Sequence, residues 1–259
     1  MKRRIAISAL SVLVAALLAT VASGELIQKG NLRVSFTGTF SPKDLPRDRP
    51  APVAVEVEGS IATTDDSRPP VLTQIEIGIN RNGLISTRGL PICRASQLQS
   101  TTTAQALERC GPAKVGNGRF AGRIDFSGVD PVPARGRILV FNGRAQGKRA
   151  LLLQLYSGAP VKITFVVPLK IQDRREGKFG TVLSAKLPVL AGGSATVTRI
   201  ELKIGRTYSY KGQRRAFISA SCAAPAGFTA AIFAFARGSF HFSDGKTVRV
   251  SITRDCRVR

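Results

Sequence analysis

The residues that could carry acid–base or nucleophilic chemistry are few and dispersed. His241 is the single histidine of the chain and stands between Phe240 and Phe242. Alternation along a strand would place His241 on the opposite face from both rings, so we interpret it as a surface side chain. Catalytic triads and zinc sites need several such groups to converge, and the neighbours of His241 in sequence do not supply them. We predict no catalytic residue, no metal site and no cofactor.

The acidic residues offer little more. Asp65 and Asp66 lie in a loop rich in threonine and serine and could offer oxygens to calcium, but the spacing is not that of an EF-hand loop. We interpret them as a solvated loop. A glycosidase would need a pair of carboxylates, and no such pair stands out among the remaining candidates, which include Asp125, Asp130, Asp173 and Glu176. The motifs of α/β-hydrolases, phosphate-binding loops and zinc proteases are also missing from the sequence, which favours a non-enzymatic protein.

Basic side chains give the strongest positive signal, with a formal net charge of +23. They gather in three connections and in the C-terminal tail. If the connections meet at one end of the fold, they would bind polymers that carry phosphate or carboxylate groups. The alternative is dispersed charge that keeps the protein soluble and attracts it loosely to an anionic cell surface. The candidate ligand-binding residues are Arg144, Lys148 and Arg149, then Arg174, Arg175 and Lys178, then Lys211, Arg214 and Arg215, with Arg254, Arg257 and Arg259 in the tail.

Specific nucleic-acid recognition is disfavoured. The chain has no tryptophan and three tyrosines, and its phenylalanines follow core patterns. Few aromatic side chains are therefore left on which bases could stack.

The four cysteines predict two disulfide bonds in an exported chain. Sequence order suggests Cys93 with Cys110 and Cys222 with Cys256. The two other pairings stay open at this point. A bond between Cys93 and Cys110 would close a short loop and stabilise it by roughly 3 kcal/mol on the chain-entropy account.

A short helix is predicted inside that first loop. Thr102 and Gln105 have the spacing of a capping box, which starts a helix that should run to about Arg109. Gly111 is expected to take the left-handed conformation at the helix end, and Pro112 prevents continuation.

The N-terminus has the form of a secretory signal peptide. A basic start, residues 1–4, precedes an uncharged apolar run, residues 5–22, that ends in small residues. Cleavage could follow Ser23 or Gly24, and removal of residues 1–24 would leave residues 25–259; retention as an anchor is the alternative. We expect a secreted or cell-envelope protein with no further membrane-spanning segment.

Strand patterns fill the rest of the chain after a leader at residues 24–30. Apolar residues alternate at Leu32, Val34 and Phe36, and similarly near residues 53–57, 75–79 and 248–252. Continuous apolar runs at 138–141, 151–153 and 165–167 predict strands buried on both faces. An aromatic strand within 228–242 should bend or bulge at Gly238 and return through the Asp244–Gly245 turn.

These elements predict an all-β protein, an antiparallel β-sandwich or jelly-roll-like fold with one short disulfide-stapled helix. Residues 25–259 would form one domain. A two-lobed arrangement that joins near residues 173–178 is the alternative.

Three segments carry a resemblance: GLPIC…ALERCGPAKVGNG, ARGRILVFNGR and SASCAAPAGFTAAIFAFARGSFHFSDGKT. Through them the sequence resembles a group of uncharacterised exported β-rich proteins of actinobacteria. The resemblance implies secretion and no particular activity, so it transfers no functional residue.

The leading functional hypothesis is a secreted or envelope-associated protein that binds anionic surface polymers through its basic loops. A carbohydrate-active hydrolase that uses an unidentified carboxylate pair is the first alternative. A structural matrix component is the second.

Overall fold

The computed structural model describes residues 25–126, 128–190, 192 and 194–259. The predicted signal peptide, residues 1–24, lies outside the described residues. Strands make up 63% of the structure and helices 7%.

The strands in chain order are β1 (Glu25–Lys29), β2 (Leu32–Ser41), β3 (Asp44–Leu45), β4 (Ala51–Pro52), β5 (Ala54–Thr63), β6 (Leu72–Asn80), β7 (Gly83–Ile85), β8 (Cys93–Arg94), β9 (Lys114–Ile124), β10 (Val132–Ala145), β11 (Lys148–Ser157), β12 (Ile163–Glu176), β13 (Phe179–Lys186), β14 (Ala195–Ile204), β15 (Thr207–Tyr210), β16 (Gln213–Ala216), β17 (Ile218–Ala220), β18 (Ala230–Phe242) and β19 (Thr247–Val258). The helical segments are α1 (Ala95–Leu98), α2 (Thr103–Cys110) and the 3-10 helix η1 (Gly111–Ala113).

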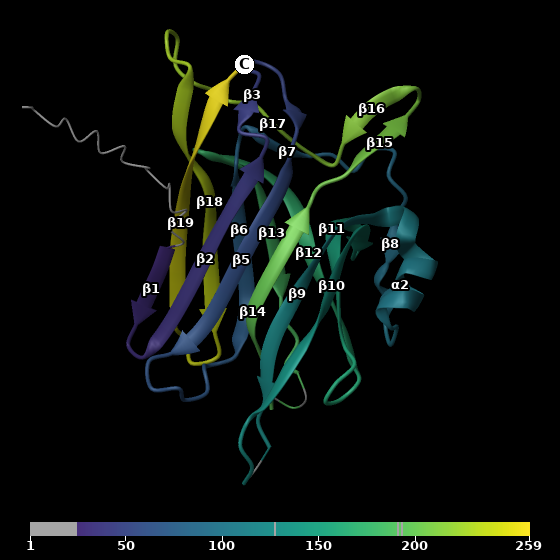
Figure 1. The fold of residues 1–259 in the computed structure, drawn as a ribbon, viewed down its shortest axis with the longest axis vertical. Coiled ribbons are helices and arrows are strands. Elements are labelled where there is room, and N and C mark those ends of the chain that lie inside the picture. Colours follow the sequence, from purple (N-terminus) through teal and green to yellow (C-terminus); the bar gives the residue numbers. More distant parts are fainter. Residues whose placement is uncertain (1–24, 127, 191, 193) are drawn as a thin grey trace, which may run out of the picture.

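One large sheet curls almost round on itself (Figure 1). Its order is β1-β2-β5-β14-β9-β10-β11-β12-β13-β6-β18-β19-β3, and apart from the short pairings of β3 and β8 its neighbours are antiparallel. Side chains join the two ends of this order, since Glu25 Oε2 on β1 accepts from the Ser251 amide on β19 at 3.2 Å. The two halves of the sheet therefore face each other like the layers of a sandwich, which confirms the predicted all-β antiparallel class.

Glycines on β9 and β10 let neighbouring strands approach closely where the sheet bends. A Cβ atom on Gly118 would lie 2.0 Å from the carbonyl oxygen of Glu201 on β14. One on Gly136 would lie 2.2 Å from the carbonyl oxygen of Tyr156 and 2.4 Å from the Phe120 ring. Any other residue would push these strands apart, so the curl depends on glycine at both positions.

Alternating strands bury one face toward the inside of the curled sheet. On β2, Leu32, Val34 and Phe36 are buried as predicted, and the residues between them are more exposed. The predicted two-face burial holds for β10 and β11. Their inner faces join the interior core, whereas Leu139 and Phe141 of β10 pack with the helices on the outer face.

The stapled helix forms as predicted at its start and differs at its end. Thr102 Oγ1 accepts from the Gln105 amide at 3.3 Å, and Gln105 Oε1 accepts from the Thr102 amide at 3.0 Å. The disulfide Cys93–Cys110 forms, with Cα atoms 5.6 Å apart. Gly111 is not left-handed but has a φ of −48°, because the chain continues into η1 instead of reversing.

Of three further predictions, one is confirmed and two are wrong. The Cys222–Cys256 bond is confirmed, with Cα atoms 5.8 Å apart. The predicted leader is instead β1, because its backbone pairs with β2 over its whole length. The bulge in β18 lies between Ala234 and Ala236, not at Gly238. Gly238 instead makes room for a ring, since a Cβ atom there would lie 2.7 Å from Phe240.

The two ends of the curled sheet differ. The upper end in Figure 1 carries the C-terminus, the small sheet β4-β17-β7 and the hairpin β15-β16. The lower end carries the connections at residues 64–71, 125–131, 158–162 and 187–194. We use these two names below.

Candidate functional site

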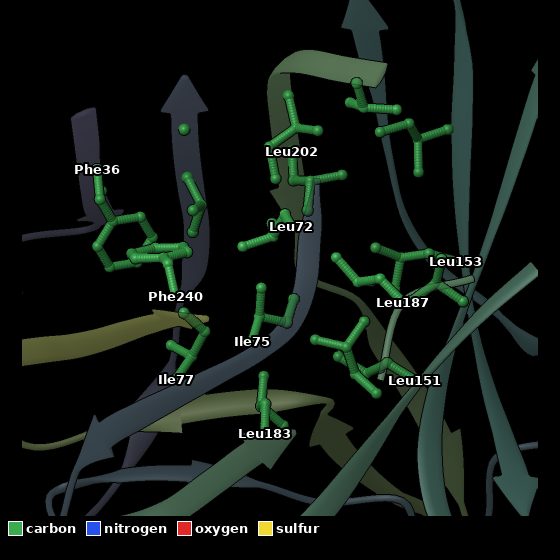
Figure 2. A pocket seen from close by; sticks show the side chains of 18 of the residues that line it. Phe36, Leu72, Ile75, Ile77, Leu151, Leu153, Leu183, Leu187, Leu202 and Phe240 are labelled. Atoms are coloured by element: carbon green, nitrogen blue, oxygen red, sulfur yellow. The ribbon is translucent and has the colours of Figure 1, made fainter. Parts of the chain in front are cut away.

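A cavity of about 290 Å³ lies inside the curled sheet. Figure 2 shows aliphatic side chains from both halves of the sheet pointing toward it, with Phe36 and Phe240 at one side. The ring centroids of these two phenylalanines are 5.6 Å apart, so they close that side by an edge-to-face contact. The labelled aliphatic residues are Leu72, Ile75, Ile77, Leu151, Leu153, Leu183, Leu187 and Leu202.

The walls of the cavity are not in full contact with one another. Ile75 and Ile77 of β6 and Leu202 of β14 face inward but are only half-buried, although each packs against the core. Protein interiors are normally packed as densely as organic crystals. Side chains that border an unfilled volume lack the dispersion contacts that a filled interior would give them.

The two ends of the cavity are closed to different degrees by the chain. At the upper end Phe217 is fully buried, and Ile85 and Ile218 pack beside it from the small sheet. At the lower end the lining reaches the connections themselves, through residues 70–72 and through Leu187, Pro188 and Leu190. The upper lining also includes Leu84, which is 46% exposed, but connections line the lower end on two sides, at residues 70–72 and 187–190, and we refer to the lower end as the entrance.

The cavity offers apolar contact and almost no polar chemistry. Among its described lining residues the charged one is Arg199, whose guanidinium group bonds to Glu58 and Glu201 at 2.5 and 3.3 Å. A polar group placed deep inside would lose its hydrogen bonds to water without replacement. The site suits an aliphatic or aromatic molecule.

A pair of carboxylates lies on the outer face of the sheet, where Glu58 on β5 is directly opposite Glu201 on β14. Arg199 bridges the two, and Arg119 lies 2.6 Å from Glu201. Hydrogen bonding and charge from Arg119, with a contribution from Arg199, lower the pKa of Glu201. A glycosidase general acid needs a raised pKa, so this pair does not supply one.

The other acidic candidates are held by their own loops or by basic neighbours. Asp65 accepts from Ser67 and Asn31, and these hydrogen bonds lower its pKa to about 2. Asp125 pairs with Arg123 at 2.7 Å. The described residues contain no group of three or more potential metal ligands.

Of the three remaining acids, Asp173 and Asp130 lie in different parts of the fold, and neither lies with the histidine. Asp173 on β12 pairs with Arg149 at 2.5 Å, and Asp130 is exposed at the lower end. Nothing is described for the side chain of Glu176. His241 is half-buried, and its Nδ1 lies 3.2 Å from Thr247 Oγ1.

Two of the three predicted basic connections lie at the upper end. Arg144, Lys148 and Arg149 flank the β10–β11 turn, and Arg174 and Lys178 flank the β12–β13 turn. The β10–β11 turn is joined to strand β12 by the ion pair between Arg149 and Asp173 and by the 2.6 Å bond from Lys170 to Gln146. Because Ala150 pairs with Lys170, β12 continues past this turn, and the β12–β13 turn lies beyond it on the neighbouring strand. The side chain of Arg175 is not described.

The third connection lies apart. Lys211, Arg214 and Arg215 belong to the β15–β16 hairpin, whose Tyr208 hydroxyl donates to the Arg88 carbonyl at 2.7 Å. No hydrogen bond or ion pair among residues with described side chains joins this hairpin to the two turns. The C-terminal tail is well separated from the hairpin in Figure 1.

Sequence reasoning missed the cavity. The strand patterns predict its lining residues as core, because an inward-facing isoleucine has the same pattern in sequence whether or not a side chain of the opposite strand touches it. A usable signal did exist at the entrance, where Phe126, Val129, Val161 and Val189 stand in connections that turn residues would normally occupy.

No helix within the described ranges has the length and apolar character needed to cross a bilayer. No family model matches the chain, and no curated protein or solved structure is significantly similar to it.

Proposed function

We propose that the protein binds an apolar molecule, such as a single aliphatic or isoprenoid chain, in the cavity of the curled sheet. The observation that carries this proposal is the unfilled apolar volume between the two halves of the sheet. Ligand pockets commonly measure about 300–1,000 Å³, so this cavity suits one chain. Any polar end of the ligand lies at the lower end, where water is available.

The protein acts outside the cytoplasm in this proposal, either secreted or held at the cell envelope. The disulfides Cys93–Cys110 and Cys222–Cys256 support this location, since such bonds persist in oxidising compartments. A carrier in that environment would keep an apolar chain away from water without chemical change.

The test is titration with N-phenyl-1-naphthylamine, a neutral probe whose fluorescence rises in apolar surroundings. The chain has no tryptophan to interfere. We expect saturable binding that a C16 fatty acid displaces. The double variant Ile75→Phe/Leu202→Phe fills the cavity from two half-buried positions and should abolish binding while preserving the fold.

The matched control is Arg249→Phe, which adds the same ring at an exposed position of β19. It should bind the probe like the wild type. Absence of saturable binding in the wild type, or equal binding by the filled variant, would overturn the proposal.

A second candidate function is binding of anionic surface polymers at the upper end. The contact of the β10–β11 turn with β12, the strand that leads into the β12–β13 turn, favours it. This function does not compete with the first, because the turns and the cavity use different surfaces. The matrix-component alternative stays a prediction, and self-association without ligand is its test.

A further inference from the structure

Four large apolar side chains are exposed on three connections of the lower end. Phe126 and Val129 are 48% and 62% exposed, and Val161 and Val189 are 48% and 62% exposed. Strands β9 and β10, β11 and β12, and β13 and β14 lead into these connections, so all four side chains lie at the same end of the sheet. Large exposed apolar surfaces mark interaction sites, and the connections that carry these four side chains belong to neighbouring strands of the sheet.

One of these connections is also part of the cavity wall. Pro188 and Leu190 line the cavity, while Val189 between them is exposed to solvent. The same few residues therefore contact the interior and the surroundings. A surface that receives Val189 would lie directly at the entrance.

Basic side chains accompany the apolar ones. Lys162 follows Val161, Lys186 precedes the connection that carries Val189, and Arg135 lies near the start of β10. All three are exposed, and none takes part in an ion pair among the residues with described side chains. The nearby acid Asp125 is already paired with Arg123 and Arg68. Asp130 on the same connections and Asp65 and Asp66 on the adjoining 64–71 connection are exposed acids of this end.

We infer that the lower end docks on an anionic lipid surface, with the four apolar side chains inserted among the acyl chains. This inference rests on the proposed function, since a membrane contact at the entrance would let an apolar chain pass into the cavity without crossing water. Apolar side chains with flanking lysine and arginine are the combination that binds the interface of anionic membranes. A protein partner would more readily fit one continuous apolar patch than side chains carried on separate connections.

The first test is sedimentation with phosphatidylcholine vesicles that contain 30% phosphatidylglycerol. We compare the wild type with a quadruple variant in which Phe126, Val129, Val161 and Val189 become serine. The wild type should bind, and the quadruple variant should bind about tenfold more weakly or worse, because the inserted apolar area is lost. The matched control is Phe228→Ser/Ile232→Ser, which removes exposed apolar groups, 64% and 83% exposed, from the opposite end.

The second test separates charge from insertion. Changing Lys162, Lys186 and Arg135 to glutamine should weaken binding to the anionic vesicles about tenfold or more and leave binding to pure phosphatidylcholine unchanged. The same number of changes at the upper end, Lys148→Gln/Arg174→Gln/Lys178→Gln, should have a much smaller effect. If instead the upper-end variant loses vesicle binding and the lower-end variants keep it, the inference is overturned.

Probe binding in solution distinguishes failure of this inference from failure of the proposed function. The quadruple variant should keep wild-type affinity for N-phenyl-1-naphthylamine, because its changed side chains are not among those that line the cavity. A wild type that binds the probe but not vesicles would overturn docking alone. A wild type that binds vesicles through the lower end but not the probe would overturn the carrier function and support the docking surface.

Discussion

The two faces of strands β10 and β11 are both apolar, but the chain covers them differently. On the outer face Leu139 and Phe141 are buried under α1 and α2. On the inner face Ile138 and Leu151 are buried as well, but Ile75 and Leu202, which line the same cavity from other strands, are only half-buried. The outer face has a partner made by the neighbouring residues 93–113, whereas the inner face depends on strands far away in sequence. The comparison teaches that apolar surface alone does not distinguish a core from a binding site.

Truncation on the two faces should give the largest contrast. Phe141 is fully buried on the outer face, so Phe141→Ala should lower the free energy of unfolding by roughly 3–5 kcal/mol. Leu202 already borders the cavity, and Leu202→Ala should cost only about 1–2 kcal/mol because little packing is lost. Urea denaturation with both variants measures the difference. Equal losses would mean that the inner face is packed like the outer one.

Removal of the disulfide in the outer layer should have the next largest effect. The variant Cys93→Ser/Cys110→Ser opens a loop with a sequence separation of 17 and should destabilise the protein by about 3 kcal/mol. Thermal unfolding measures this loss. At temperatures where the variant stays folded, its affinity for N-phenyl-1-naphthylamine should be unchanged, since the bond contacts only the outer layer. A parallel loss of probe binding would show that the two faces are coupled.

A rise in salt concentration should distinguish binding in the cavity from binding at the basic turns, which lie at the upper end of the same strands. Binding of a polyphosphate to the wild type should weaken steeply as salt rises, whereas probe binding should not. The triple variant Lys148→Gln/Arg174→Gln/Lys178→Gln should lose roughly tenfold in polyphosphate affinity. The control Lys211→Gln/Arg214→Gln/Arg215→Gln changes the separate β15–β16 hairpin and should lose less. Equal effects would indicate dispersed charge without a defined site.

A fall in pH should have the smallest effect on the free energy of unfolding. This effect should come from Asp65 at the lower end and not from the outer layer. Hydrogen bonds from Ser67 and Asn31 lower the pKa of Asp65 from 3.8 to about 2. The folded state therefore favours the ionised form, and the resulting stability is present above pH 4 and lost as the pH falls toward 2. Asp65→Asn should flatten the stability curve across this interval. Denaturant midpoints measured from pH 5 to pH 2 for both proteins give the comparison, and identical slopes would contradict it.

Local patterns predicted much of the fold. The capping box at Thr102 and Gln105 formed because its groups lie within one turn of helix. The alternation at Leu32, Val34 and Phe36 located a buried strand face for the same reason, since neighbouring side chains of a strand point in opposite directions. Sequence order also suggested the observed cysteine pairs.

Predictions that needed distant neighbours were less accurate. The sequence predicts a leader at residues 24–30, yet residues 25–29 form β1 because β2 offers an unpaired edge. The bulge expected at Gly238 lies between Ala234 and Ala236, where β18 adjusts its register against β19. Of the three basic connections, the two that lie on neighbouring strands at the upper end are those whose strands pair.

The sequence by itself determined the strand-rich composition, the short capped helix and the strong positive charge. It also suggested the two cysteine pairs. Only the tertiary structure decided that the inward-facing residues leave a cavity, that its entrance coincides with four exposed apolar side chains, and which basic turns lie on neighbouring strands. The physical reason is the distance along the sequence between the residues that interact. Helix caps and strand alternation depend on residues a few positions apart. An unfilled volume depends on how far apart two walls of the sheet lie and on how large their side chains are, and those walls come from strands throughout the chain.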